Sequence, residues 1–218
     1  SLKPNIAVLS NILLEVDKGG IRISSTNLDM GITLWVPAEV TATGSTTVSG
    51  KLLNDFVSVQ PEGQISVLQD NQKVVVSSNK ATADFQVIPA EDFPVLPKPG
   101  DPLFQVDLDL LMSQLETVVS SASTDMNTAR IQFTGVLLDI NEDNKNANLV
   151  ATDTYHLSLA KLKIENYDQG EKKIIIPAKS LSELVKILST VKESLNVEVY
   201  LSESRSQIIF KFDNVEFS

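Results

Sequence analysis

The chain carries NILLEV at residues 11–16 and repeats the pattern as GVLLDI at residues 135–140, 124 positions later. Both stretches combine a run of apolar residues with one acidic residue in the fifth place. This composition is typical of a β-strand that packs on a core. A repeat over such a distance predicts two similar domains, each with its own copy of the strand.

Two further blocks follow in the same order. IRISSTN at residues 21–27 matches ANLVATD at residues 147–153, with an offset of 126 positions. TVSGKLL at residues 47–53 matches IIPAKSL at residues 175–181, with an offset of 128 positions. The first pair predicts a second strand, and the other pair predicts a strand that gives way to a helix. Each copy is then expected to return to strands, so the fold class is α+β.

Helix signals accompany both copies. Ser180 and Glu183 have the spacing of a capping box, which predicts a helix N-terminus at Ser180. The apolar face of this helix comprises Leu181, Leu184, Val185 and Leu188, and that of its counterpart comprises Leu52, Leu53, Phe56 and Val57. A third amphipathic helix is expected over residues 108–122, capped by Asp107. This helix precedes the first strand of the second copy.

Prolines at positions 94, 97, 99 and 102 mark the domain boundary, because proline continues neither a helix nor a central strand. We therefore expect one domain over residues 1–100 and another over residues 101–218. The first copy begins its opening strand too early to hold a counterpart of the helix at 108–122. The second copy stops before any counterpart of Ile88–Pro94. These differences predict a fragment of a longer repeat protein.

Composition excludes several classes of protein. The 218 residues have 42% hydrophobic and 21% charged content, which favours a folded globular chain. The absence of cysteine excludes disulfide scaffolds and thiolate metal sites. A net charge of −10 disfavours attraction to nucleic acid over the whole surface. No run of consecutive apolar residues in the sequence is as long as a membrane-spanning helix requires.

Catalytic and ligand-binding motifs are scarce. His156 is the one histidine, with Asp153 and Tyr155 close in sequence. The stretch from Gly44 to Leu52 resembles a phosphate loop, but five residues separate its glycines and Leu52 replaces the hydroxyl that holds magnesium. Residues 141–146 are acidic but lack the glycine and terminal glutamate of a calcium loop. No metal and no cofactor are expected.

Lysines recur at equivalent places in the two copies. Lys51 and Lys179 stand at matching helix starts, and Lys186 lies two turns along the second helix. On an acidic chain, such lysines predict a local positive surface for a phosphate backbone. Exposed lysines are also common on amphipathic helices, so this pattern alone leaves both interpretations open.

Three short motifs then point to one family. Val8–Leu14, Pro89–Pro94 and Val150–Asp153 resemble the bacterial DNA polymerase III beta subunit, the sliding clamp. The resemblance implies a DNA-clamp fold, with antiparallel sheets outside and amphipathic helices lining a channel. It also implies that the first domain lacks its N-terminal strand and helix, that the second lacks its C-terminal tail, and that a third domain is absent.

The resemblance implies a non-catalytic processivity factor of DNA replication in the bacterial cytoplasm, associated with the nucleoid. Its implied partners are double-stranded DNA, the replicative polymerase, the clamp loader and repair proteins, with no membrane. The full-length family member is a homodimeric ring, whereas this fragment is expected to be monomeric. The residues implied to face DNA are Lys3, Lys51, Asn127, Arg130, Lys179 and Lys186.

Partners of the family enter a hydrophobic pocket through short linear peptides. The matching positions are Phe133, Thr152, Thr154, Tyr155, His156 and Leu157. Family members commonly have glycine where Thr154 stands and arginine where His156 stands. Because imidazole loses its charge near neutral pH and guanidinium does not, this exchange predicts weaker or pH-sensitive peptide binding. Phe56 and Phe85 are expected at the dimer edge, with unusual exposure in this fragment.

Two other interpretations of the sequence remain. The first is a two-domain α+β adaptor that binds proteins without encircling DNA. The second is an enzyme that uses His156 with Asp153. Retention on circular DNA distinguishes a clamp from an adaptor, and turnover lost on His156→Ala distinguishes an enzyme from both.

Overall fold

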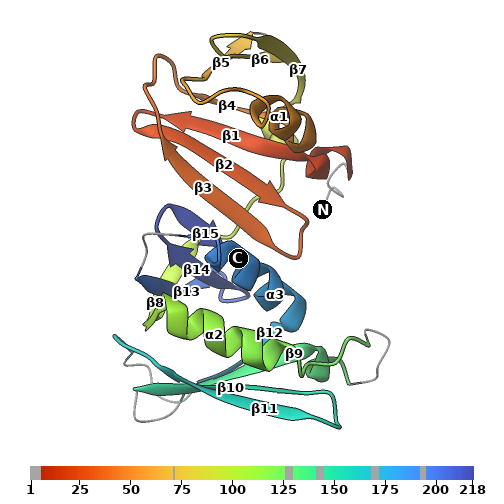
Figure 1. The fold of residues 1–218 in the computed structure, drawn as a ribbon, viewed down its shortest axis with the longest axis vertical. Helices are drawn as coiled ribbons and strands as arrows, with labels where there is room; N and C mark the ends of the chain where they lie inside the picture. Colours follow the sequence, from red (N-terminus) through yellow and green to blue (C-terminus); the bar gives the residue numbers. More distant parts are fainter. Residues whose placement is uncertain (1–5, 71, 126–129, 141–144, 168–171, 192–194) are drawn as a thin grey trace. The chain divides into compact units, whose positions relative to one another are not determined.

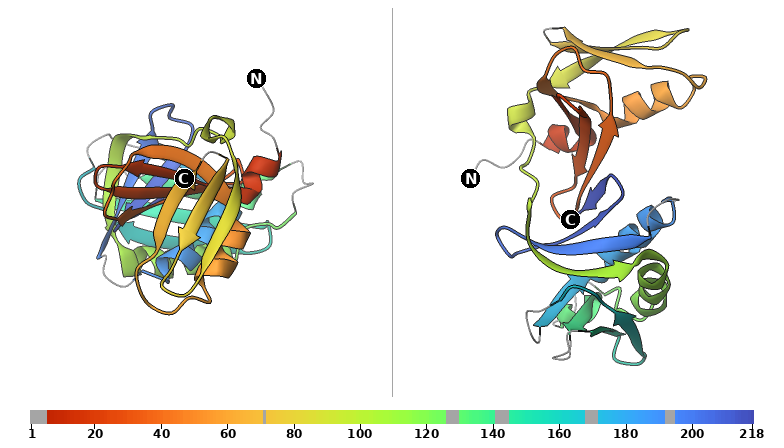
Figure 2. Two further views of the ribbon diagram at one scale, coloured as in Figure 1. Left: turned by 90° about the horizontal axis from the view of Figure 1, so that it is seen from above. Right: turned by 90° about the vertical axis from the view of Figure 1, so that its left-hand side faces the viewer.

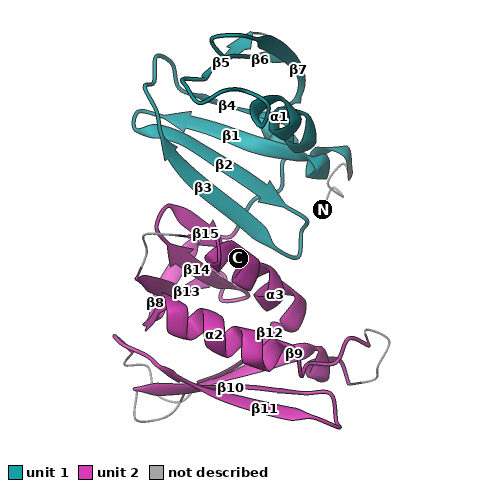
Figure 3. Cartoon of the chain, in the orientation of Figure 1, with its two compact units in different colours: residues 1–96 teal, residues 97–218 magenta. Residues whose placement is uncertain are grey.

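The structure is a computed structural model that describes residues 6–70, 72–125, 130–140, 145–167, 172–191 and 195–218. The chain divides into two compact units, residues 1–96 and residues 97–218 (Figure 3). Each unit is built mainly from antiparallel strands (Figure 1). Within the described residues, no helix is long and apolar enough to cross a membrane.

The described residues of unit 1 form a twisted sheet with one α-helix. Its strands lie in the order β5-β6-β7-β4-β1-β2-β3. Their bounds are β1 Asn11–Asp17, β2 Gly20–Thr26, β3 Gly31–Pro37, β4 Gly44–Ser49, β5 Ser66–Asp70, β6 Lys73–Ser77 and β7 Thr82–Ile88. The helix is α1, Gly50–Val57, and short 3₁₀ turns occur at η1, Ile6–Ser10, and η2, Ala90–Asp92.

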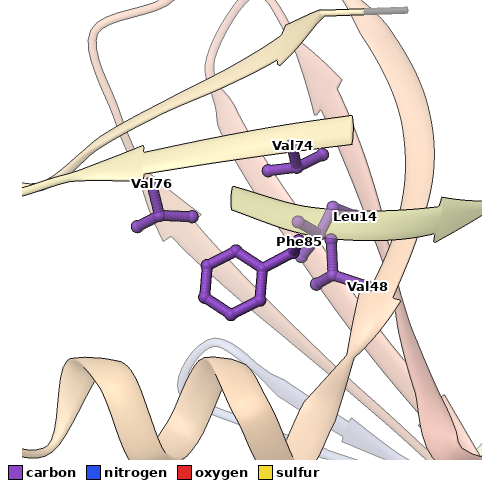
Figure 4. Close-up of a cluster of buried hydrophobic side chains, with 5 residues drawn as sticks. All are labelled: Leu14, Val48, Val74, Val76 and Phe85. Atoms are coloured by element: carbon purple, nitrogen blue, oxygen red, sulfur yellow. The ribbon is translucent and has the colours of Figure 1, made fainter. Parts of the chain in front are cut away.

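The core of unit 1 lies between the two halves of this sheet. Leu14, Val48, Val74, Val76 and Phe85 are buried together (Figure 4). The ring of Phe56 meets that of Phe85 edge to face, with 6.0 Å between ring centroids. The expected exposure of the two phenylalanines is therefore wrong, because Phe85 is only 6% exposed and Phe56 is half-buried. An aromatic pair of this geometry stabilises the core beyond the area that it buries.

Two sheets and two long helices make up the part of unit 2 that the structure describes. Its strands are β8 Pro99–Asp107, β9 Gly135–Ile140, β10 Asn146–Thr152, β11 Leu157–Lys163, β12 Lys172–Pro177, β13 Asn196–Ser202, β14 Ile208–Phe212 and β15 Val215–Phe217. Its helices are α2, Leu108–Val119, α3, Ala178–Leu188, and the 3₁₀ turn η3, Ile131–Thr134. One sheet has the order β11-β10-β9-β12, and the other joins β8, β13, β14 and β15. Helix α2 packs on α3, β10 and β11.

The strand register confirms the repeat. Leu14 lies opposite Ile23 and Thr46, and its counterpart Leu138 lies opposite Leu149 and Ile174. These partners have the offsets of the sequence blocks, 126 and 128 positions. Because a slip of one residue turns every side chain to the other face, equal register means equal core faces. The growth of the offset from 124 to 128 falls in the connections between strands.

The two helix-cap predictions have different outcomes. Asp107 is the N-cap of α2, since its Oδ1 accepts a hydrogen bond from the Leu110 N–H at 2.8 Å, as expected. The capping box at Ser180 and Glu183 is wrong. Strand β12 runs directly into α3 at Pro177, so Ser180 lies inside the first turn of the helix. Glu183 instead forms an ion pair with Lys186.

Candidate functional site

The turn between β10 and β11, residues 152–156, is held by its own short polar side chains. Thr152 Oγ1 donates to the His156 carbonyl at 2.6 Å and accepts from the Thr154 N–H at 3.1 Å. Asp153 Oδ1 accepts from the backbone N–H groups of Tyr155, at 2.9 Å, and His156, at 2.6 Å. Threonine and aspartate favour such turns because their oxygens bond nearby backbone groups. Thr154 takes the left-handed conformation, with φ of 82°.

An aspartate and a histidine side chain form a hydrogen bond on the same turn. Asp153 Oδ2 lies 2.9 Å from His156 Nδ1. The hydrogen bond with the His156 ring is the main cause that holds the pKa of Asp153 well below its usual range, and the two backbone N–H groups add to it. The carboxylate is therefore ionised over the ordinary pH range and orients the imidazole ring.

Apolar side chains emerge beside this turn. Tyr155 is 90% exposed and Leu157 is 69% exposed. Phe133, in η3, is half-buried, and the Arg130 guanidinium carbon lies 6.0 Å from the centre of its ring. An exposed tyrosine and leucine on a hydrogen-bonded turn offer contact area to a partner, because their burial removes apolar surface from water.

The segment 121–123 connects Phe133 to the same end of β11. The Ser121 hydroxyl lies 2.6 Å from the hydroxyl of Ser158, next to Leu157. The Ser123 N–H donates to the Phe133 carbonyl at 2.8 Å. Four predicted pocket residues, Thr152, Thr154, Tyr155 and His156, thus lie on the turn, and Leu157 begins β11 directly after it. Phe133 is connected to this end of β11 through these serines. Sequence reasoning missed the serines, because nothing in the local sequence indicates pairs 37 positions apart.

Unit 1 contains a second copy of this turn, at residues 26–30. Thr26 Oγ1 donates to the Met30 carbonyl at 2.7 Å and accepts from the Leu28 N–H at 3.0 Å. Asn27 Oδ1 takes the place of the carboxylate oxygen and accepts from the Asp29 and Met30 N–H groups. Leu28 is also left-handed, with φ of 77°. The offset of 126 positions was the signal that could have identified this second turn.

The predicted DNA-facing lysines occupy matching places. Lys51 is the second residue of α1 and Lys179 is the second residue of α3, and both side chains are exposed. Neither helix has an acidic residue in its first turn. The Lys186 ammonium lies 2.8 Å from Glu183 Oε1, so its charge is partly offset. Lys3 and Asn127 lie outside the described residues.

Metal-ligating side chains do not gather in the described part of the chain. No group of three or more histidine, aspartate or glutamate residues there has the arrangement of a metal site. The Asp153–His156 pair is exposed and belongs to the turn.

Comparison with known proteins gives consistent matches. Residues 1–97 match the DNA polymerase III beta subunit, N-terminal domain, and residues 105–218 match its central domain. A beta sliding clamp from Micrococcus luteus is 30% identical over 191 residues, which cover 87% of this chain and 60% of the relative. The chain thus spans less than two thirds of the length of this relative.

Solved structures agree with this result. The sliding clamp of Bacillus subtilis superposes with a TM-score of 0.86 at 25% identity, over 100% of this chain and 58% of that one. The Helicobacter pylori beta clamp bound to a DNA ligase peptide has the same fold, with a TM-score of 0.79 at 19% identity, over 99% of this chain and 59% of that one. The clamp fold expected from the sequence is thereby confirmed. Since the central-domain match alone covers more than half of its residues, the chain belongs to the DNA polymerase III beta subunit family.

Proposed function

We propose that this chain is part of a DNA polymerase processivity factor, a clamp that encircles duplex DNA without sequence specificity. The observation that carries the proposal is the match of both units to consecutive domains of the beta subunit. The clamp acts without catalysis, in the bacterial cytoplasm at the nucleoid. We assign ring closure to a homodimer of the full-length protein. In this proposal the Phe56–Phe85 pair packs inside the first domain and stabilises the edge that takes part in the dimer.

The repeated helix starts support the DNA contact. The N-terminus of a helix carries a partial positive charge, which favours anions and disfavours cations. Lys51 and Lys179 stand in that position, where lysine is unfavourable for the helix itself. Their placement concentrates positive potential at two equivalent points of a chain with net charge −10. Phosphates are the ligands that such points favour, and Arg130, Lys186, Lys3 and Asn127 complete the proposed surface.

The turn at 152–156 supports peptide binding. Its backbone is held by four hydrogen bonds, so Tyr155 and Leu157 are presented from a pre-organised loop. A related clamp from Helicobacter pylori binds a DNA ligase peptide. We assign the pocket to Phe133, Thr152, Thr154, Tyr155, His156 and Leu157, with the polymerase, the clamp loader and repair proteins as partners.

Charge reversal tests the DNA assignment. Lys51→Glu, Lys179→Glu and Lys186→Glu are combined in the ring-forming protein, and retention on primed circular DNA is measured after loading. Because affinity for a phosphate backbone scales with the number of contacts, we expect a loss of about tenfold or more, largest at low salt and smaller as the salt concentration rises. The matched control carries Lys18→Glu, Lys80→Glu and Lys163→Glu, which change the net charge equally on exposed lysines elsewhere.

Two outcomes oppose the proposal. Equal losses in the two triple variants mean that only net charge matters, and the assigned lysines are then wrong. Retention that survives linearisation of the DNA excludes topological encirclement.

A further inference from the structure

The turn between β10 and β11 carries two groups that its backbone does not need. Unit 1 builds the same turn with Asn27 in the place of Asp153 and with Met30 in the place of His156. A single side-chain oxygen, Asn27 Oδ1, accepts both backbone N–H groups there. The second carboxylate oxygen of Asp153 and the ring of His156 are therefore additions to a turn that forms without them. These two additions meet, with Oδ2 and Nδ1 2.9 Å apart.

The carboxylate determines which ring nitrogen carries the proton. The hydrogen bond from the His156 ring, together with those from two backbone N–H groups, holds the pKa of Asp153 well below its usual range. An ionised carboxylate only accepts hydrogen bonds, so His156 Nδ1 must donate and must carry a proton. The neutral imidazole holds one proton, and Nε2 is consequently left as an acceptor.

This acceptor nitrogen is open to a ligand. The His156 side chain is 76% exposed, and no group in the described part of the chain forms a hydrogen bond with its Nε2. Tyr155 and Leu157, which flank it in the chain, are 90% and 69% exposed. A partner that packs on these two side chains brings its own polar groups close to the imidazole ring.

The strands on either side keep the turn in place. Thr152 lies opposite Leu157 as the last pair of the β10–β11 ladder, so the turn closes the hairpin directly. Helix α2 packs on both strands, and Figure 2 (right) shows it along one face of their sheet. A group presented from such a hairpin loses little conformational freedom when a ligand binds, which favours selective recognition.

We propose that Asp153 is a positioning residue that keeps the proton of the neutral His156 ring on Nδ1, so that the turn selects partner peptides that place a hydrogen-bond donor opposite Nε2. Amide, hydroxyl and backbone N–H groups are suitable donors, whereas a carboxylate oxygen meets a lone pair and is disfavoured. The proposal rests on the peptide binding proposed above and specifies the chemistry of the ligand. Asp153 acts through His156 and makes no contact with the peptide itself.

The nitrogen resonances of the ring measure the tautomer directly. His156 is the one histidine of the chain, so its ring nitrogens are assigned without ambiguity in an isotope-labelled sample. At the pH plateau where the same spectra show a neutral ring, we expect the proton on Nδ1 in the wild-type chain. Asp153→Asn keeps the oxygen that Asn27 supplies in unit 1 and turns an amide N–H toward Nδ1. In this variant the proton is therefore expected to move to Nε2.

Peptide selection is measured on the ring-forming protein at the neutral plateau, with the DNA ligase peptide that the related Helicobacter pylori clamp binds as the probe. Each peptide position is replaced in turn by glutamine and by glutamate, which have nearly the same shape, although only glutamine donates. At one position we expect the wild-type protein to prefer glutamine by about three- to tenfold, the range of one hydrogen bond. Asp153→Asn is expected to remove the preference at that position.

His156→Gln provides the matched background for the charge that Asp153→Asn removes. A glutamine side chain offers both a donor and an acceptor whatever residue stands at position 153, so Asp153→Asn is expected to have no effect on the preference in this background. An equal effect of Asp153→Asn in the two backgrounds assigns the preference to net charge, and the positioning role is then wrong.

Three further results overturn the proposal. A neutral wild-type ring with its proton on Nε2 contradicts the role of Asp153. Saturable binding of the probe with no positional preference for glutamine contradicts the proposed selection and leaves the peptide-binding function intact. No saturable binding up to about 1 mM peptide, the weak end of specific recognition, contradicts the peptide-binding function and the selection with it.

Discussion

Helices α1 and α3 begin at equivalent points of the repeat, yet they bury very different surfaces. α3 buries Ala178, Leu181, Leu184 and Leu188, with α2 packed beside it. No residue of α1 is buried, and Leu52 on its apolar face is 57% exposed. The same sequence pattern therefore sets where a helix starts, whereas the neighbouring helix determines how much it contributes to stability.

Truncating one leucine in each helix is the strongest way to break this comparison. Leu184→Ala removes a fully buried side chain and is expected to lower the free energy of unfolding by about 2–5 kcal/mol, through lost transfer energy and the cavity left behind. Leu52→Ala removes an exposed side chain and is expected to cost less than about 0.5 kcal/mol. Urea denaturation of both variants measures the difference. Similar losses in the two variants contradict the assigned packing of α1.

The two turns make the opposite comparison, because their backbones agree and their side chains differ. Residues 26–30 and 152–156 share the same four side-chain hydrogen bonds and the same left-handed third residue. Leucine holds that position in unit 1 and threonine in unit 2. A β-branched residue in the left-handed region is strained, more than leucine is.

Glycine at this position sharpens the comparison. Thr154→Gly removes the strain of a positive φ and is expected to raise the free energy of unfolding by about 0.5–1 kcal/mol, after the entropy that glycine adds to the unfolded chain. Leu28→Gly is expected to gain less, because leucine is not β-branched. Both side chains are exposed, so little packing is lost. Differential scanning calorimetry gives the two shifts, and a larger gain at Leu28 opposes the explanation.

Lowering the pH is expected to affect the two turns differently, and this effect is smaller than the effects of the substitutions above. The pKa of Asp153 is held well below its usual range by the His156 hydrogen bond, so the turn has its full support above the unfolded value of about 3.9. That support is lost as the pH falls through the folded value. Asn27 holds the unit 1 turn without a titrating group. Amide NMR shifts of Tyr155 and His156 are expected to change only well below pH 3.9.

The variant Asp153→Asn is the control for this titration. It keeps the acceptor oxygen that Asn27 supplies in unit 1, so the turn is expected to persist with no acid-induced change. A midpoint near the ordinary aspartate value in the wild-type chain contradicts the role of His156.

Much of the strand arrangement follows from the sequence, because the repeat carries register as well as strand identity. The blocks at residues 11–16 and 135–140 predict which strands correspond, and their cross-strand partners confirm it. The Asp107 cap is also local information, since a cap and its amide lie three residues apart. Local patterns succeed where the interaction itself is local.

The remaining features depend on contacts that are distant in sequence. Ser180 and Glu183 match a capping box, but β12 leads directly into the helix, so the N-cap is Pro177, three residues before Ser180. Exposure of Phe56 and Phe85 was expected from a family edge, whereas the sheet closes over Phe85. For the site, the order Thr152 to Leu157 predicts one turn, but the link through Ser121 and Ser123 to Phe133 required the structure.

The lengthening of the repeat offset also indicates where this architecture tolerates extra chain. Residues 17–20 of unit 1 correspond to residues 141–146 of unit 2, and residues 38–43 correspond to residues 164–171. Each connection in unit 2 is two residues longer, although the strands on either side keep their partners. The fold therefore accepts two additional residues in each of these connections without a change in strand pairing. The two shorter connections of unit 1 are the natural points for grafting a tag or a fluorophore.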